Sequence, residues 1–88
     1  MNVGIVGLGL IGGSFAKAYA EAGHTVLGRD TDTVMLHYAQ ISGTVSETLT
    51  EENVSSCDLL LIAVPPRAAV ACLAALAPHI GPGPVVVD

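Results

Sequence analysis

These 88 residues are 51% hydrophobic and only 12% charged, about half of the charged fraction of roughly 25% that is typical of soluble domains. Domains most often contain about 100–150 residues, so the length excludes several domains and predicts one small domain or part of a larger one. The net charge is −5, and the three basic residues, Lys17, Arg29 and Arg67, are too few to form the basic patch that nucleic acids require. The shortage of charge leads us to expect that further polypeptide covers part of the surface.

The cysteines and the N-terminus also limit the class of protein. Cys57 and Cys72 have neither CxxC spacing nor histidines at zinc spacing, so we expect no metal site, and reduced, buried thiols are favoured over a disulfide. Met1 leads into an apolar strand without the basic segment of a signal peptide. The longest apolar run, residues 59–64, is too short to span a bilayer. We therefore expect a cytoplasmic protein with no membrane partner.

The first thirty residues predict one βαβ unit. Residues 3–6 form a β-branched run that is typical of a strand buried on both faces. A glycine-rich turn follows, and then a helix that Gly23 ends. Residues 25–30 predict a second strand, which finishes in Asp30. The helix carries its apolar residues on one face: Ile11, Phe15, Ala18, Tyr19 and Ala22.

The middle of the chain predicts shorter elements. Residues 31–33 supply a cap for a helix that ends at Ser42-Gly43, and residues 44–48 are typical of a short outer strand. Thr48 and Glu51 have the spacing of a capping box, which predicts one or two helical turns up to Ser56.

The C-terminal part predicts the remaining strands of the sheet. Residues 58–64 are apolar on both faces, which indicates a central strand, and residues 81–84 predict a turn before a last strand at residues 85–88. The helix between them, residues 67–77, has these residues facing inward: Val70, Leu73, Leu76 and Ala77.

The alternation of strands and helices predicts an α/β fold. We expect a Rossmann-like, doubly wound parallel sheet of about five strands in the order 3-2-1-4-5. A full dinucleotide fold has a sixth strand, so residues 1–88 are expected to be the N-terminal portion of an NAD(P)-binding domain. The exposed edge at residues 85–87 is expected to make the chain self-associate as a homo-oligomer.

The glycine-rich turn predicts a dinucleotide site. Gly7, Gly9 and Gly12 follow a predicted strand directly and open a predicted helix, and Asp30 ends the next strand 18 residues after Gly12. In this motif the first glycine permits the turn, the second admits the pyrophosphate and the third lets the helix approach the strand. The N–H groups around Leu10 and Ile11 are then expected to face the phosphates.

Asp30 favours NAD over NADP, because a carboxylate accepts hydrogen bonds from the ribose hydroxyls and repels a 2′-phosphate. Arg29 leaves three alternatives open: it pairs with that phosphate, it points to solvent, or it lies on the adenine ring. At the end of the fourth strand, Ala63, Val64 and Pro65 are expected to line the ribose and nicotinamide side of the cleft, or else they only terminate the strand.

No residue of the chain is predicted to be catalytic. His24, His37 and His79 lie at or beyond helix positions away from the expected cleft. The cysteines have no base partner, so nucleophilic catalysis has no support. Ser14, on the first turn of the glycine-loop helix, faces the ligand or packs within the helix.

Residues 3–14, with the glycine pair followed by Ser14, resemble the opening of prephenate and arogenate dehydrogenases, the enzymes of tyrosine biosynthesis. Other stretches match in order along the whole chain: Gly23-His24, Gly28-Arg29-Asp30, residues 58–66, residues 76–80 and Val87-Asp88. The resemblance is to the N-terminal half-domain of these enzymes.

The resemblance implies an NAD(P)-dependent oxidative decarboxylation of prephenate to 4-hydroxyphenylpyruvate, or of arogenate to tyrosine. It also implies a catalytic histidine, a substrate-binding arginine and a helical dimerisation domain, all of which come after the point where this sequence stops. We therefore expect the 88-residue chain to be inactive alone. Two alternatives are another Rossmann oxidoreductase, of the hydroxyacid dehydrogenase or pyrroline-carboxylate reductase type, and a nucleotide-binding module without catalysis.

Overall fold

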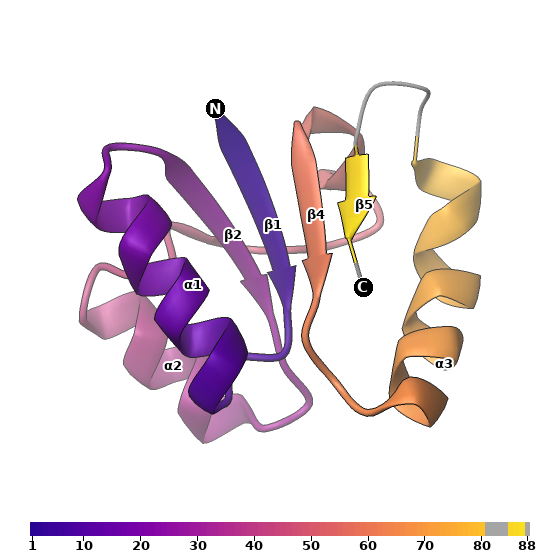
Figure 1. Cartoon of the computed structure of the whole chain (residues 1–88), viewed down its shortest axis with the longest axis horizontal. Helices are drawn as coiled ribbons and strands as arrows, with labels where there is room; N and C mark the ends of the chain where they lie inside the picture. The colour runs from indigo at the N-terminus through magenta and orange to yellow at the C-terminus, as the bar shows by residue number, and fades with distance from the viewer. Residues whose placement is uncertain (81–84, 88) are drawn as a thin grey trace.

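The computed structural model describes residues 1–80 and 85–87, which form a five-stranded parallel sheet in the order β3-β2-β1-β4-β5. Figure 1 shows β2, β1, β4 and β5 side by side. The expected fold class and strand order are therefore confirmed. The turn predicted at residues 81–84 and the terminal Asp88 lie outside the described residues. The elements in chain order are β1 (Asn2–Val6), α1 (Leu10–Glu21), β2 (Thr25–Arg29), α2 (Thr33–Ile41), β3 (Glu47–Thr48), the 3₁₀ turn η1 (Val54–Ser56), β4 (Leu59–Ile62), α3 (Pro66–Leu76), the 3₁₀ turn η2 (Ala77–His79) and β5 (Val85–Val87).

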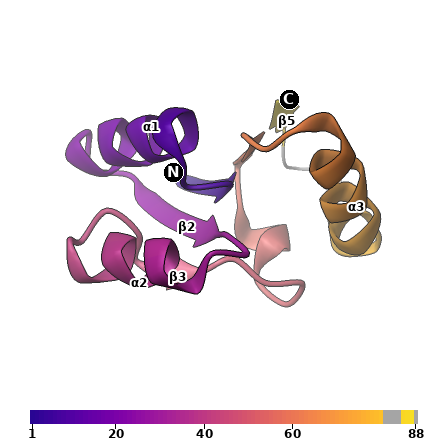
Figure 2. The same ribbon diagram turned by 90° about the horizontal axis from the view of Figure 1, so that it is seen from below.

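The sheet has a core layer on each face. β1 lies between β2 and β4, with Gly4 opposite Leu27 on one side and Leu60 on the other. Side chains of successive strand residues point to opposite faces, so one face of β1 packs against α1 and α2 and the other against α3 and η1. Figure 2 shows α1 and α2 well separated from α3. This arrangement buries the central strands on both sides, which explains their continuous apolar sequence.

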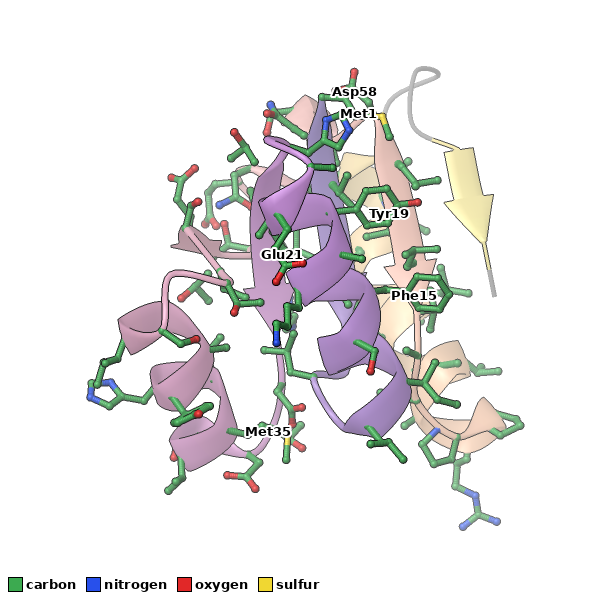
Figure 3. The ribbon with its side chains drawn as sticks, turned by 60° about the vertical axis from the view of Figure 1, so that its left-hand side comes forward. Met1, Phe15, Tyr19, Glu21, Met35 and Asp58 are labelled. Atoms are coloured by element: carbon green, nitrogen blue, oxygen red, sulfur yellow. The ribbon has the colours of Figure 1, made fainter. Side chains whose placement is uncertain are left out.

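The helix α1 packs through a different face from the one that its large apolar residues predict. Its buried residues are Gly12 and Ala16. Of the predicted residues only Tyr19 is half-buried against the core, whereas Ile11 is 67% exposed, Phe15 is 49% exposed, and Ala18 and Ala22 are exposed. A Cβ atom on Gly12 would lie 1.7 Å from the carbonyl oxygen of Gly7, so only glycine permits the closest point of helix and strand. That contact fixes the rotation of α1. Phe15 and Tyr19 project from the side of the helix next to β4 (Figure 3).

The buried face of α3 agrees with the predicted one only in part. Leu76 is buried as predicted, but Val70 is 68% exposed and Ala77 is exposed, and Ala69 is buried instead. The helix begins at Pro66, and the N–H of Ala69 donates to the carbonyl of Pro65 at 2.9 Å. This start turns the small side chain of Ala69 toward the sheet. Leu73 is half-buried, as is Cys72, which the sequence analysis did not place inward.

The strand predicted at residues 44–48 is only two residues long. The N–H groups of Thr44 and Val45 both donate to the carbonyl of Ala39, at 3.1 Å, and thereby close the end of α2. Residues engaged in closing a helix cannot pair with β2, so the strand β3 is reduced to Glu47 and Thr48, and the N–H groups of Ser46 and Leu49 on either side donate to carbonyls of β2.

The predicted capping box forms two residues further along the chain. The N–H of Thr50 donates to Oδ1 of Asn53 at 2.8 Å, and the N–H of Asn53 donates to Oγ1 of Thr50 at 3.3 Å. The predicted partners, Thr48 and Glu51, do not make this exchange, because Glu51 extends toward Arg29 instead.

No helix within residues 1–80 or 85–87 is long and apolar enough to cross a membrane. β5 is the last strand in the sheet order, beside β4. Self-association through this edge stays a prediction.

Candidate functional site

The carboxyl ends of β1, β2 and β4 meet at one edge of the sheet. The N–H of Gly7 donates to the carbonyl of Arg29 at 2.8 Å, and the N–H of Ala63 donates to the carbonyl of Val6 at 2.7 Å. Here the strand order reverses direction, because β2 lies on one side of β1 and β4 lies on the other. Open α/β sheets bind ligands at such a point. Figure 2 views the molecule from this end.

Each glycine of the loop between β1 and α1 meets a different steric requirement. Gly7 has a φ of +93°, and a Cβ atom there would lie 2.5 Å from the carbonyl oxygen of Ala63. Gly12 is required by its contact with Gly7. A Cβ atom on Gly9 would meet nothing within 4 Å, and Gly9 is exposed. The fold itself therefore requires glycine at positions 7 and 12. At Gly9 the fold would accept a side chain, but the lack of one leaves open space beside the loop.

The N-terminus of α1 presents free N–H groups beside Gly9. The first hydrogen bond of the helix joins the N–H of Gly13 to the carbonyl of Gly9, at 2.7 Å. The N–H groups of Leu10, Ile11 and Gly12 therefore have no acceptor within the helix. Gly9 offers no capping side chain, and the first turn carries no acidic residue. This end of the helix has the partial positive charge that binds anions.

Asp30 joins the glycine loop to the end of β2. Its Oδ2 accepts a hydrogen bond from the N–H of Leu8 at 2.8 Å, and its Oδ1 accepts one from the N–H of Asp32 at 2.8 Å. A carboxylate can accept about four hydrogen bonds, so these two leave capacity for ligand hydroxyls. The sequence motif predicts the carboxylate at this place but not its structural role in the loop.

Arg29 forms an ion pair that the sequence does not predict. Its Nη1 lies 3.4 Å from Oε1 of Glu51, and the two side chains are 34% and 38% exposed. A hydrogen bond from its own backbone and the charge of Arg29 both lower the pKa of Glu51. A side chain that only points to solvent does not describe this ion pair, and the two alternatives that involve the bound cofactor stay predictions.

A cavity of about 330 Å³, the α3 cavity, lies between the strand ends and α3. It brings together four residues that the sequence predicts for the site: Gly7, Arg29, Asp30 and Val64. The sequence did not lead us to expect that α3 forms a wall of this site. Small residues recur on one face of the helix at helical spacing, and they could have indicated it. The remaining lining residues are Val6, Thr31, Ala68, Ala71, Cys72 and Ala75.

A second hollow, the α1 groove, lies on the other side of β4. It measures about 570 Å³, and Phe15 lines it together with four residues that the sequence predicts for the site: Ile11, Ala63, Val64 and Pro65. Val64 borders both hollows. The predicted residues are thus divided between two neighbouring spaces that meet at the end of β4. Leu10 is 90% exposed, at the rim of the glycine loop.

The side chains considered for acid–base or nucleophilic work are His24, Ser14 and the two cysteines. Nδ1 of His24 lies 2.9 Å from the N-terminal amine of Met1, within hydrogen-bond distance, at the opposite end of β1 from the glycine loop. The hydroxyl of Ser14 donates to the carbonyl of Leu10 at 2.6 Å, so the helix backbone occupies it. Burial raises the pKa of both thiols, Cys57 and Cys72, which leaves little reactive thiolate at neutral pH.

The strand order and the glycine loop define an NAD(P)-binding Rossmann domain of the oxidoreductase class. The chain belongs to the family described as NADP oxidoreductase coenzyme F420-dependent, whose sequence pattern matches residues 2–88. Coenzyme F420 is not a cofactor that the sequence analysis predicts. No curated protein matches the chain.

Solved structures confirm the resemblance to arogenate and prephenate dehydrogenases. Arogenate dehydrogenase from Synechocystis is 28% identical with a TM-score of 0.89, and the match covers 98% of this chain and 31% of that one. Prephenate dehydrogenase from A. aeolicus, in complex with hydroxyphenyl propionate and NAD⁺, is 26% identical with a TM-score of 0.83, covering 98% and 32%. The 3-hydroxyisobutyrate dehydrogenase of Mycobacterium tuberculosis shares the fold at 21% identity and a TM-score of 0.88, covering 99% and 30%. The chain thus spans about a third of the length of these relatives.

Proposed function

We propose that this chain is the dinucleotide-binding part of an NAD(P)-dependent dehydrogenase that oxidatively decarboxylates prephenate. In this proposal residues 1–88 form the N-terminal portion of the nucleotide domain and supply no catalytic side chain. The likeness to arogenate and prephenate dehydrogenases, at 28% and 26% identity, supports the choice of substrate class. The chain alone is expected to show no turnover of prephenate with NAD⁺.

The observation that carries the proposal is the open space at Gly9 beside the free N–H groups of α1. A pyrophosphate placed there would meet the positive end of the helix with no side chain in its path. The adenosine would then occupy the α3 cavity, within reach of Asp30. The nicotinamide would lie along Ala63 and Pro65, at the α1 groove.

We infer that NAD is preferred to NADP. The carboxylate of Asp30 keeps acceptor capacity for ribose hydroxyls, and its charge opposes a 2′-phosphate. The solved relative from A. aeolicus holds NAD⁺, which agrees with this preference. The family description names NADP, so the experiment must compare the two cofactors directly.

Calorimetric titration of the chain with NADH and with NADPH tests the proposal. We expect NADH to bind at least about tenfold more tightly, a difference of about 1.4 kcal/mol. Absence of binding by either cofactor would contradict the assignment of a working site to these 88 residues, and tighter binding of NADPH would contradict the preference alone.

The two cysteines provide a second test with an internal control. Cys72 lines the α3 cavity, whereas Cys57 is only 3% exposed in the core. On the folded chain, N-ethylmaleimide should label Cys72 faster than Cys57, and both rates should rise with pH because burial raises both thiol pKa values. Saturating NADH should slow labelling of Cys72 and leave Cys57 unchanged, as measured by mass spectrometry of peptides. If NADH leaves the rate at Cys72 unaltered, the cavity is not the adenosine site.

A further inference from the structure

Arg29 is the one cation among the described residues that lines the α3 cavity, where it stands next to Asp30 and Thr31. Its backbone is fixed, because its carbonyl accepts the hydrogen bond from Gly7 at the end of the sheet. Its side chain is about one third exposed and therefore has room to move. A guanidinium at this position that is free to reorient is a good ligand for phosphate, with which it forms strong paired hydrogen bonds.

Glu51 holds this guanidinium in place. Nη1 and Nη2 of Arg29 both point to the same oxygen, Oε1 of Glu51, at 3.4 and 3.5 Å. Both partners are partly exposed, and the contact is long and made through a single carboxylate oxygen. Such a pair is weak in water, so Glu51 restrains Arg29 without locking it.

The turn that carries Glu51 is rigid. Thr50 and Asn53 exchange hydrogen bonds across it, and the side-chain amide of Asn53 also donates to the carbonyl of Thr48 at 2.8 Å. The N–H of Leu49 donates to the carbonyl of Gly28 at 2.7 Å, which ties the segment to β2 one residue before Arg29. The backbone of Glu51 is therefore set at a fixed place relative to the end of β2.

We propose that Glu51 is a positioning residue for cofactor specificity: it holds Arg29 away from the ribose 2′ position, so that the site disfavours a 2′-phosphate. Asp30 and Glu51 together outweigh the single charge of Arg29, so a 2′-phosphate would meet a net negative surrounding. Without the charge of Glu51, Arg29 offsets Asp30 and is free to pair with the phosphate. This inference rests on the proposed dinucleotide site.

The test compares Glu51→Gln with Glu52→Gln. Both substitutions remove one negative charge and keep the side-chain size, but Glu52 is the exposed neighbour, and the ion pair of Arg29 is with Glu51. The ligands are adenosine 2′,5′-bisphosphate and 5′-AMP, which differ only in the 2′-phosphate, followed by NADPH and NADH. Urea unfolding of each variant establishes that it folds as the wild type does.

We expect Glu51→Gln to tighten adenosine 2′,5′-bisphosphate and NADPH by about threefold to fivefold, the range of an exposed ion pair, with 5′-AMP and NADH within twofold. Glu52→Gln should leave the affinities for all four ligands unchanged. Replacing Arg29 by methionine in the Glu51→Gln background should remove the gain.

Three results would overturn the inference. The first is that Glu51→Gln gains no affinity for the two ligands with a 2′-phosphate. The second is that this gain in affinity persists when Arg29 is replaced. The third is an equal change for ligands with and without the 2′-phosphate, which would mean that Arg29 stacks on the adenine ring. If wild-type protein binds NADH and any of these results is found, the inference alone fails. If wild-type protein binds none of the four ligands, the proposed function fails and takes the inference with it.

Discussion

Replacing Gly12 by alanine is expected to destabilise the protein by at least about 3 kcal/mol. Overpacking a core costs about 1–3 kcal/mol when side chains can shift, but here the new Cβ atom meets the backbone carbonyl of Gly7 at 1.7 Å. This clash is relieved only if α1 moves away from β1, and that movement opens the core around Ala16. Because small domains are stable by only about 5–15 kcal/mol, much of the protein should be unfolded in low urea. Urea unfolding followed by far-ultraviolet circular dichroism measures the loss.

Gly9→Ala is the matched control, because it places the same methyl group in the same loop. Nothing lies within 4 Å of a Cβ atom there, and the φ of −69° suits alanine. The free energy of unfolding should fall by no more than about 1 kcal/mol, the effect of a poorer helix N-cap. Affinity for NADH should fall by about tenfold or more, because the methyl group fills the space proposed for the pyrophosphate.

The two glycine variants can fail separately. A Gly12→Ala protein as stable as the wild type would contradict the close contact between α1 and the loop. Unchanged NADH affinity in Gly9→Ala would contradict the placement of the pyrophosphate and leave the packing argument intact.

The sheet was predictable because the sequence of each central strand is enough to indicate that it is buried. Residues 3–6 and 59–62 are apolar on both faces, and only a strand covered on both sides buries such a sequence. The glycine loop was predictable for a similar reason, since the steric demands at Gly7 and Gly12 are local. The order of the strands in the sheet then follows from right-handed crossovers between parallel strands.

The rotation of the helices was not predictable from their apolar pattern. Ile11 and Phe15 make a convincing apolar face, yet the contact at Gly12 decides how α1 sits. In α3 the start at Pro66 turns Ala69 inward in place of Val70. Small residues set both contacts, and a hydrophobic pattern gives them the least weight.

The electrostatics of the site depend on contacts between distant segments. The hydrogen bond from Leu8 to Asp30 and the ion pair of Arg29 with Glu51 each join residues 22 apart. No local spacing encodes such contacts. The motif therefore predicted which residues gather at the site but not which partners occupy their side chains.

Replacing Asp30 by alanine is expected to weaken both cofactors and not merely to abolish the choice between them. The N–H of Leu8 is part-buried and donates to Asp30, and the loss of its acceptor costs about 1–3 kcal/mol. The N–H of Asp32, just before α2, loses its acceptor as well. The glycine loop is then no longer fixed to the end of β2, so NADH affinity should fall by about tenfold or more and NADPH should gain nothing. Calorimetry with both cofactors, beside urea unfolding, measures the two effects.

Asp30→Asn separates the hydrogen bonds of Asp30 from its charge. The asparagine amide keeps one acceptor oxygen, which can serve Leu8, but its NH₂ group cannot accept from Asp32. Its stability should therefore lie between those of the wild type and Asp30→Ala, while the loss of charge removes the repulsion of a 2′-phosphate. Of the two Asp30 variants, only Asp30→Asn should bring the affinity for NADPH close to that for NADH. If Asp30→Ala instead keeps full stability and gains NADPH affinity, the carboxylate acts through its charge alone, and its hydrogen bond to the glycine loop contributes nothing to the site.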